Sequence, residues 1–227
     1  MIRNKLRNPH LYVITDRELS KGRLITEIIA GAIAGGASII QLRDKESTTK
    51  KLIRDAFALR ELTKEKDAIF IVNDRVDVAL AVGADGVHLG QDDFPVKLAR
   101  KLIGTDKIIG VSVGNVEEAI QAVKDSADYV SIGSIFPTQT KPDAGDAVGT
   151  QIITAIKKYV NVPLVAIGGI TEDNIAQVAK AGADCAAVIS AVVGADDVED
   201  AARCLIKRFL GGLHGTEICK KQRTTSS

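Results

Sequence analysis

The chain has 227 residues, and its 30 lysine and arginine residues nearly balance 29 aspartate and glutamate residues, leaving a formal net charge of +1. Hydrophobic residues make up 45% of the chain and charged residues 26%, which is ordinary for a globular protein with a large core. The balanced charge argues against a nucleic-acid or membrane-surface binder, because such proteins usually carry a basic excess. No apolar run is long enough to cross a membrane, and the first ten residues lack the apolar core of a signal peptide.

Short β-branched runs alternate with amphipathic helical patterns along the chain. The predicted strands are residues 10–16, 38–44, 68–74, 86–90, 107–113, 129–135, 162–170 and 185–192. The predicted helices are residues 23–34, 48–65, 75–82, 94–103, 115–124, 149–160, 172–181 and 196–210. This alternation predicts fold class α/β and a single (β/α)8 TIM barrel, with an open doubly wound sheet as the alternative.

The barrel is expected to form one catalytic domain, because no linker or change of composition divides the chain. We place this domain at residues 1–210. Residues 211–227 are polar and lack periodicity, so we expect a disordered C-terminal tail.

A small-residue turn precedes each even-numbered predicted strand. The four turns are Gly35–Ser38, Gly83–Gly86, Ser126–Tyr129 and Gly182–Cys185. Glycine at a helix C-terminus adopts the left-handed conformation that ends the helix, and the small residues after it let the chain enter the next strand tightly. The repeat therefore supports the barrel.

The three cysteines, Cys185, Cys204 and Cys219, are an odd number in a chain that is long enough to build a core without disulfides. We therefore expect reduced thiols and a cytoplasmic location. No pair of cysteines or histidines has the spacing of a transition-metal site.

Polar residues follow nearly every predicted strand. In a TIM barrel the active site lies at the C-terminal ends of the strands, so these residues are expected to meet at one rim. The residues at the strand ends are Thr15, Asp16, the segment Gln41–Lys45, Asn73, Asp74, the segment Gly90–Asp93, Ser112, the segment Pro137–Lys141, Gly168, Gly169, Ile189 and Ser190.

The segment Gln41–Lys45 ends the second predicted strand. Successive side chains of a strand point to opposite faces, so Gln41, Arg43 and Lys45 share one face. The cations Arg43 and Lys45, with Lys141 from the loop after the sixth strand, suit a highly charged phosphate group. The amides of Gln41 and Asn73 add hydrogen-bonding groups to this set.

Two carboxylates, Asp74 and Asp93, follow neighbouring strands beside the amide of Asn73. Carboxylates would repel a phosphate ligand unless a cation lay between them. Mg²⁺ held by one or two carboxylates and by substrate phosphates fits this pattern. The residues therefore indicate a diphosphate bound with Mg²⁺.

The turn at Gly168 and Gly169 opens a predicted helix and, with the loop at Ser190, is typical of a barrel phosphate site. Two anion sites on one rim imply two phosphorylated substrates, or one substrate with two phosphorylated ends.

These features also have structural interpretations. The cationic row could form ion pairs with Asp16, Asp44 and Asp74 that only close one end of the barrel. The glycine pair could be a tight turn, and the acidic residues after the fourth strand could favour a helix N-terminus. His88 lies within an apolar strand and is interpreted as a core histidine.

Six motifs taken together resemble the signature of the thiamine phosphate synthase family, with matching order and spacing over about residues 10–210. The motifs are Gln41–Lys45, Val72–Asp74, Val87–Asp93, Gly110–Ser112, Pro137–Lys141 and Ile167–Ile170.

The resemblance implies an enzyme of thiamine biosynthesis, a transferase acting on two phosphorylated small molecules. The family joins 4-amino-2-methyl-5-(diphosphooxymethyl)pyrimidine to 4-methyl-5-(2-phosphooxyethyl)thiazole and releases thiamine phosphate and diphosphate. The substitution is Mg²⁺-assisted and dissociative, so diphosphate leaves before the thiazole nitrogen captures the carbocation.

The resemblance also implies roles for particular residues. Those expected to act in catalysis are Arg43, Lys45, Ser112 and Lys141. Those expected to bind the pyrimidine diphosphate are Gln41, Leu42, Arg43, Asp44, Lys45, Asn73, Ser112 and Lys141. Those expected to bind the thiazole phosphate are Thr138, Gln139, Thr140, Gly169, Ile189 and Ser190. Asp74 and Asp93 are expected to bind Mg²⁺.

Three rival functions stay open: a sibling of the same fold that tautomerises the thiazole precursor, a sugar-phosphate epimerase or aldolase, and a protein that only binds thiamine phosphates. The complete diphosphate and Mg²⁺ set disfavours the first. No partner other than substrates is expected, although a homo-oligomer is left open. Residues 139–148 are the candidate lid.

Overall fold

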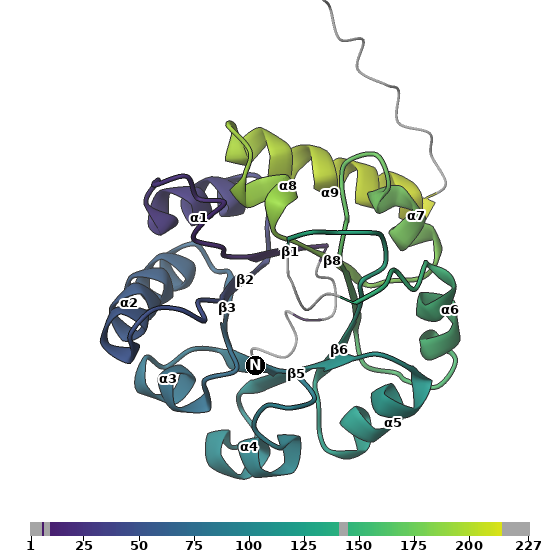
Figure 1. Cartoon of the computed structure of the whole chain (residues 1–227), viewed down its shortest axis with the longest axis horizontal. Coiled ribbons are helices and arrows are strands. Elements are labelled where there is room, and N and C mark those ends of the chain that lie inside the picture. The colour runs from purple at the N-terminus through teal and green to yellow at the C-terminus, as the bar shows by residue number, and fades with distance from the viewer. Residues whose placement is uncertain (1–5, 7–9, 141–144, 215–227) are drawn as a thin grey trace, which may run out of the picture.

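The computed structural model describes residue 6, residues 10–140 and residues 145–214. Eight strands form a closed barrel in the order β1 to β8, and helices surround it (Figure 1). All neighbouring pairs are parallel, including the closing pair, in which Leu11 of β1 lies opposite Ala186 of β8. The predicted (β/α)8 barrel is confirmed, and the open doubly wound sheet is excluded.

The elements alternate along the chain as the sequence predicts. The strands are β1 (Leu11–Ile14), β2 (Ile39–Leu42), β3 (Ile69–Asn73), β4 (Gly86–Leu89), β5 (Ile108–Val113), β6 (Tyr129–Ile132), β7 (Leu164–Ile167) and β8 (Cys185–Val188). The helices are α1 (Ile25–Ala34), α2 (Thr49–Glu65), α3 (Val76–Ala81), α4 (Val96–Ile103), α5 (Val116–Lys124), α6 (Gln151–Lys157), α7 (Ile175–Lys180), α8 (Ser190–Val193) and α9 (Val198–His214).

Two boundaries near the C-terminus differ from the prediction. The eighth strand was expected to reach Val192, but β8 ends at Val188 and the apolar residues after it form the short helix α8. A short apolar run shows no periodicity that distinguishes a buried strand from a buried helix, so the sequence does not separate the two. The helix α9 continues to His214, past the expected start of the tail at residue 211, and residues 215–227 lie outside the described part.

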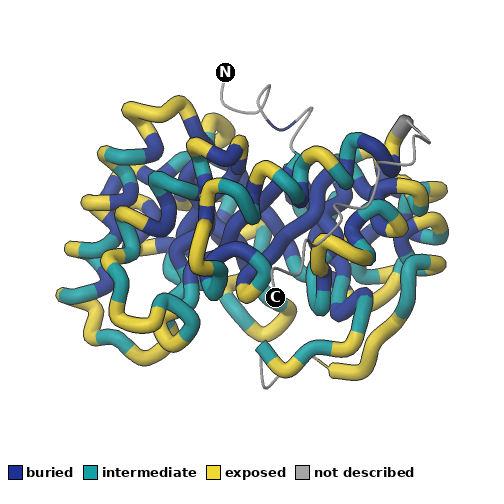
Figure 2. The backbone as a smooth tube through the Cα atoms, turned by 90° about the horizontal axis from the view of Figure 1, so that it is seen from above, coloured by how far each residue is buried: buried dark blue, intermediate teal, exposed yellow. Residues whose placement is uncertain are grey.

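The barrel has two apolar layers. One lies between the strands and the surrounding helices and includes Leu42, Phe70 and Val130, which are fully or almost fully buried. The other fills the inside of the barrel, where Ile39, Ile69 and other inward residues pack. Figure 2 shows these buried segments at the centre of the molecule, with exposed loops toward both ends of the barrel.

The four predicted turns before the even strands share one structure. In each turn one residue has a positive φ: Gly36, Gly83, Ser126 and Gly182. The amide of the alanine that follows donates to the carbonyl five residues earlier, as in Ala84 N–H to Ala79 O at 2.9 Å and Ala127 N–H to Ala122 O at 3.0 Å. This pattern is the Schellman motif, so α1, α3, α5 and α7 all end in the same way.

Three of these turns carry an aspartate that ties the barrel to a helix. Its Oδ2 accepts the backbone N–H of the preceding odd strand and a hydrogen bond from a basic residue of the preceding even helix. The three sets are Asp85 with Phe70 N–H at 2.9 Å and Arg60 at 2.9 Å, Asp128 with Ile109 N–H at 2.8 Å and Arg100 at 2.5 Å, and Asp184 with Leu164 N–H at 2.7 Å and Lys157 at 2.8 Å. The repeat is therefore a stabilising device, placed at the opposite rim from the strand C-termini.

In the described ranges, no helix combines the length and the apolar character that a membrane span needs.

We expect Asp128→Asn to lower the free energy of unfolding by about 2–3 kcal/mol, because it leaves the largely buried Arg100 guanidinium without its counter-charge. Urea unfolding followed by circular dichroism measures this. The matched control is Asp77→Asn, which removes an exposed ion pair with Arg75 and is expected to change stability by less than about 0.5 kcal/mol. Equal effects of the two substitutions would contradict the stabilising role of the aspartate.

Candidate active site

A cavity of about 290 Å³ opens at the C-terminal ends of the strands, and all eight strands contribute to its lining. Its volume is near the lower end for small-molecule sites. It brings together most of the predicted site residues in the described part: Gln41, Arg43, Lys45, Asn73, Asp74, Asp93, Ser112, Thr138, Thr140, Gly169, Ile189 and Ser190.

Four predicted site residues do not lie among the described lining residues. The side chain of Leu42 packs into the apolar layer between barrel and helices, and Asp44 accepts the backbone N–H groups of Glu46 and Ser47. Gln139 is exposed outside the cavity. Lys141 lies outside the described residues, together with residues 142–144 of the candidate lid.

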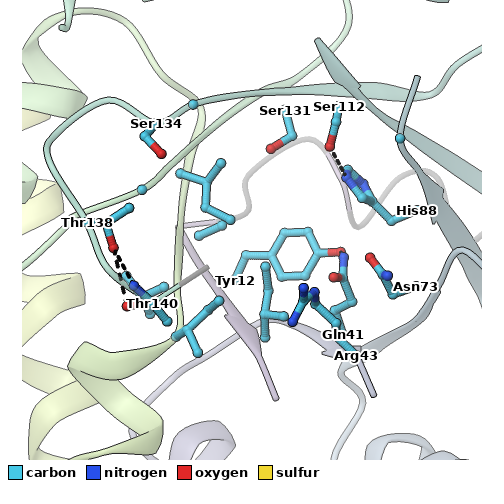
Figure 3. Close-up of a pocket in the computed structure, with 18 of the residues that line it drawn as sticks. Tyr12, Gln41, Arg43, Asn73, His88, Ser112, Ser131, Ser134, Thr138 and Thr140 are labelled. Carbon is cyan, nitrogen blue, oxygen red and sulfur yellow. Dashed lines mark hydrogen bonds between the residues drawn. The ribbon is translucent and has the colours of Figure 1, made fainter. Parts of the chain in front are cut away.

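The end of β2 is fixed by its neighbour β1. Thr15 is 2% exposed, and its hydroxyl accepts the Arg43 N–H at 2.9 Å and donates to the Arg43 carbonyl at 3.2 Å. This pair of bonds extends the sheet beyond the regular ladder and aims the alternating side chains Gln41, Arg43 and Lys45 toward the cavity, as Figure 3 shows for the first two. The buried strand β2 therefore carries polar residues at the point where its inward face reaches the cavity.

The sequence left open that Arg43 and Lys45 only form structural ion pairs. Among the described residues, one such pair is seen, and it is at Lys45. The Lys45 ammonium lies 3.7 Å from Asp74. Asp44 pairs instead with Arg17 at 3.4 Å, and Asp16 accepts the Leu19 N–H at 3.0 Å within its own turn.

Asp74 and Asp93 form a close pair of carboxyl groups at the ends of β3 and β4. Asp93 Oδ2 accepts the Gly90 N–H at 2.7 Å, which fixes its side chain at the cavity rather than on helix α4. Burial raises the pKa of Asp74 to about 6, and a hydrogen bond and repulsion from Asp93 add to the rise while Lys45 and Arg43 oppose it. A close pair of carboxyl groups, one of which resists ionising beside the other, forms a site that a cation would complete.

This pair fits a divalent cation that takes its remaining ligands from substrate and water. In the part of the chain that the structure describes, no group of three or more His, Cys, Asp or Glu side chains could hold a metal ion. Mg²⁺ is commonly bound by one or two carboxylates and the phosphate oxygens of its substrate, so a two-carboxylate site has the composition expected for it.

Across the cavity, the turn after β7 has the geometry of a phosphate site. Gly168 and Gly169 have φ values of +98° and +62°, and a Cβ on Gly169 would lie 2.5 Å from the Pro137 carbonyl oxygen, so both positions require glycine. The amides of Gly169 and Ile170 donate to no other described residue. The turn therefore offers backbone donors to an anion.

Three residues with hydroxyl groups line the cavity together with this turn. Thr138 Oγ1 accepts the Thr140 N–H at 3.2 Å, and Thr140 Oγ1 lies 3.4 Å from Ser190 Oγ. Figure 3 shows Thr138 and Thr140 together on one side of the cavity, away from Arg43 and Gln41. The two predicted anion sites are therefore separate groups of residues within one cavity.

Three residues at or beneath the floor of the cavity were not assigned to the site from the sequence. Tyr12, His88 and Tyr129 lie at inward positions of β1, β4 and β6, and Tyr12 and His88 line the cavity. His88 is the core histidine that the sequence predicted, since both of its ring nitrogens have partners, but it is also a part of the site. The available signal was that a buried tyrosine needs a hydrogen-bond partner for its hydroxyl group.

Comparison with known proteins gives consistent matches. The family model described as thiamine monophosphate synthase matches residues 11–192. A thiamine-phosphate synthase of Chloroflexus aurantiacus is 56% identical over 195 residues, covering 86% of this chain and 90% of the relative, and that of Moorella thermoacetica is 53% identical, covering 86% and 93%. A solved thiamine phosphate pyrophosphorylase from Pyrococcus furiosus superposes with a TM-score of 0.84 at 47% identity, covering 94% of this chain and 100% of the other.

We expect Asp74→Asn to stabilise the protein in the absence of divalent cations. The folded-state pKa of Asp74, about 6, lies above its ordinary value of 3.8, so its ionisation costs stability as the pH rises through this window. The gain from the substitution should be absent below about pH 4, grow up to about pH 6, and stay near 1–2 kcal/mol above that.

Thermal unfolding in EDTA as a function of pH measures this gain. Asp92→Asn is the matched control, because Asp92 is the exposed neighbour of Asp93 and lies outside the cavity lining. A gain for Asp74→Asn that does not depend on pH would contradict the raised pKa.

Proposed function

Since the chain belongs to the thiamine monophosphate synthase family, which makes it a transferase of thiamine biosynthesis, we propose that it joins a pyrimidine diphosphate to a thiazole phosphate. The substrates would be 4-amino-2-methyl-5-(diphosphooxymethyl)pyrimidine and 4-methyl-5-(2-phosphooxyethyl)thiazole, and the products thiamine phosphate and diphosphate. The observation that carries the proposal is the cluster of Arg43 and Lys45 beside the Asp74 and Asp93 carboxyl pair, with a second anion-binding turn across the same cavity.

The reaction breaks the bond between the methylene carbon and the diphosphate oxygen, and the electron pair leaves with the diphosphate. The electron-rich aminopyrimidine supports the resulting cation until the thiazole nitrogen donates its electron pair to form the C–N bond. This sequence needs no protein nucleophile or strong base. It needs stabilisation of the charge that develops on the leaving group.

Arg43 and Lys45 would donate to the diphosphate as it leaves, and Ser112, which lines the same cavity, would assist them. Lys141 would add a third cation, although it lies outside the described residues. Asn73 would bind the diphosphate or the ring through its amide. Leu42, Asp44 and Gln139 are assigned no side-chain contact with substrate, because none of the three is among the residues that line the cavity.

Asp74 and Asp93 would hold Mg²⁺, which when bound neutralises charge on the departing diphosphate. The carboxyl pair supports this assignment because its members repel each other without a cation. Lys45 near Asp74 would keep the cation site and the phosphate site adjacent.

The thiazole phosphate would bind at the turn of Gly169 with the hydroxyl groups of Thr138, Thr140 and Ser190 and the backbone at Ile189. Holding the phosphate there fixes the thiazole ring at a set distance from the pyrimidine. Such positioning replaces an encounter in solution with a reaction between held partners.

The rivals lose support in different ways. An aldolase-type Schiff base requires a lysine within the barrel, and Lys45 at the rim is the one lysine among the described lining residues. A tautomerase does not need the Asp74 and Asp93 pair. A protein that only binds thiamine phosphates would use the same cavity and is distinguished by the absence of turnover. Cytoplasmic location and a possible homo-oligomer stay predictions.

We expect Arg43→Ala to lower turnover about a hundredfold, because it removes a donor to the leaving diphosphate. Thiamine phosphate is followed after oxidation to its fluorescent thiochrome. The control is Arg54→Ala, an arginine 73% exposed on helix α2 and outside the cavity, which should leave turnover unchanged. Full activity of folded Arg43→Ala would remove this residue from the catalytic set.

We expect product formation to stop when EDTA is added and to return with excess Mg²⁺. The same titration with Asp93→Asn should need a higher Mg²⁺ concentration for half-maximal activity, by about tenfold or more. Product formation that is insensitive to EDTA would contradict the metal assignment while leaving the synthase reaction in place.

A further inference from the structure

A continuous chain of hydrogen bonds crosses the inside of the barrel beneath the cavity. Gln41 Nε2 lies 2.7 Å from the Tyr12 hydroxyl, which lies 2.9 Å from the Tyr129 hydroxyl. The Tyr129 hydroxyl lies 2.9 Å from His88 Nδ1, and His88 Nε2 lies 2.9 Å from Ser112 Oγ. Five strands supply one member each, and both ends of the chain, Gln41 and Ser112, line the cavity (Figure 3).

The middle of this chain is held rigidly. Tyr12 and Tyr129 are 1% and 0% exposed, and their rings meet edge to face with centroids 6.1 Å apart. The ring of His88 stacks on Tyr129 at 5.6 Å. A Cβ on Gly110 would lie 1.9 Å from Tyr129 Cζ, so the glycine makes the space that lets Tyr129 reach between its two partners.

Each buried hydroxyl group has one proton to donate and needs an acceptor for it. Every hydroxyl proton finds an acceptor, and every hydrogen bond of the series forms, only when all the bonds run in the same direction. Burial raises the pKa of both tyrosines above the ordinary value, which keeps both hydroxyls protonated. In one direction Gln41 donates to Tyr12, Tyr129 donates to His88 Nδ1, and the His88 Nε2–H donates to Ser112. In the other direction every donor and acceptor is exchanged, and Gln41 turns its amide around.

The direction decides what the two ends offer to a ligand. When Gln41 donates to Tyr12 with its Nε2, its Oε1 remains as an acceptor for the cavity, and the Ser112 hydroxyl proton remains as a donor. In the reverse direction Gln41 offers N–H groups and Ser112 offers lone pairs. An aminopyrimidine diphosphate carries N–H donors on its ring and only acceptors on its ionised diphosphate, so it matches the first direction at both ends.

We propose that Tyr12, Tyr129 and His88 are positioning residues that set Gln41 as an acceptor for the amino group of the pyrimidine and Ser112 as a donor to its diphosphate. The inference rests on the proposed function for the identity of the ligand, while the direction of the chain is a property of the protein alone. It makes the chain a determinant of specificity, because an oxo analogue of the pyrimidine would need the opposite direction at Gln41.

The direction can be measured without substrate through the tautomer of His88. The protein has three histidines. Variants of His10 and His214 assign the signals of these two residues in full-length protein labelled with ¹⁵N-histidine. The expected wild-type state is neutral His88 with its proton on Nε2. In Gln41→Glu the ionised carboxylate can only accept, so the proton should move to Nδ1, two tyrosines away from the substitution.

The spectra are recorded between about pH 6 and pH 9, so that the buried carboxyl group introduced by Gln41→Glu ionises within the series. Adding Tyr12→Phe to Gln41→Glu interrupts the series of hydrogen bonds and should abolish the movement of the proton. Tyr159→Phe is the matched control, because Tyr159 is 65% exposed and lies outside the cavity. A wild-type His88 with its proton on Nδ1 or on both nitrogens, or a tautomer that Gln41→Glu leaves unchanged over the whole range, would overturn the proposal.

Kinetics test what the two ends recognise. Tyr12→Phe and Tyr129→Phe should each lower kcat/KM for the pyrimidine diphosphate by about tenfold to a hundredfold and leave KM for the thiazole phosphate unchanged. Tyr159→Phe should change neither. If kcat/KM fell equally for the two substrates and KM for the thiazole phosphate changed as well, the role of the tyrosines would be purely structural and the proposal would be overturned.

The two experiments separate the inference from the function on which it rests. If His88 responds as expected but no variant or wild-type protein forms thiamine phosphate, the direction of the chain is upheld and the assignment of its ends to the pyrimidine diphosphate is overturned with the proposed function. If thiamine phosphate forms but His88 does not respond, the proposed function is upheld and this inference is overturned.

Discussion

The parallel pairing of β1 with β8 closes the sheet, and this closure determines where each functional side chain lies. Because all strands are parallel, every strand delivers its C-terminal residues to the same rim. Residues from the ends of β2 and β8, which are far apart in the sequence, therefore line one cavity. The opposite rim carries the aspartates of the repeated turns, which tie strands to helices. The turns that tie strands to helices and the candidate binding cavity thus lie at opposite ends of the same barrel.

Electrostatics at the functional rim are unfavourable until a ligand arrives. Asp74 resists ionising beside Asp93, and its backbone has a positive φ of +59°, which residues other than glycine seldom adopt. Arg43 and Lys45 reduce this cost only in part. A site of this kind gains most from a ligand that brings a cation and an anion together. The costs that the protein bears without a ligand are therefore consistent with the proposed complex of a diphosphate with Mg²⁺.

Below the rim the chemistry changes from charged to neutral. The polar chain of Gln41, Tyr12, Tyr129, His88 and Ser112 is buried or partly buried, and polar groups there require complete hydrogen bonding. When all the hydrogen bonds run in the same direction, every member of the series has its donors and acceptors paired. The apolar residues of the inner layer, including Ile39 and Ile69, exclude water beneath it. The barrel interior can therefore hold a definite pattern of donors and acceptors under the cavity.

The sequence by itself determined the alternation of strands and helices, the turns before the even strands, and most of the charged site, because these depend on periodicity and on residues directly after each strand. Tertiary structure alone decided two things: that β8 gives way to helix α8, and that Tyr12 meets Tyr129 across 117 positions. An alternating pattern gives the face on which a side chain lies but not its neighbour across the barrel. Only closure of the sheet, which sets the register of all eight strands, makes that neighbour definite.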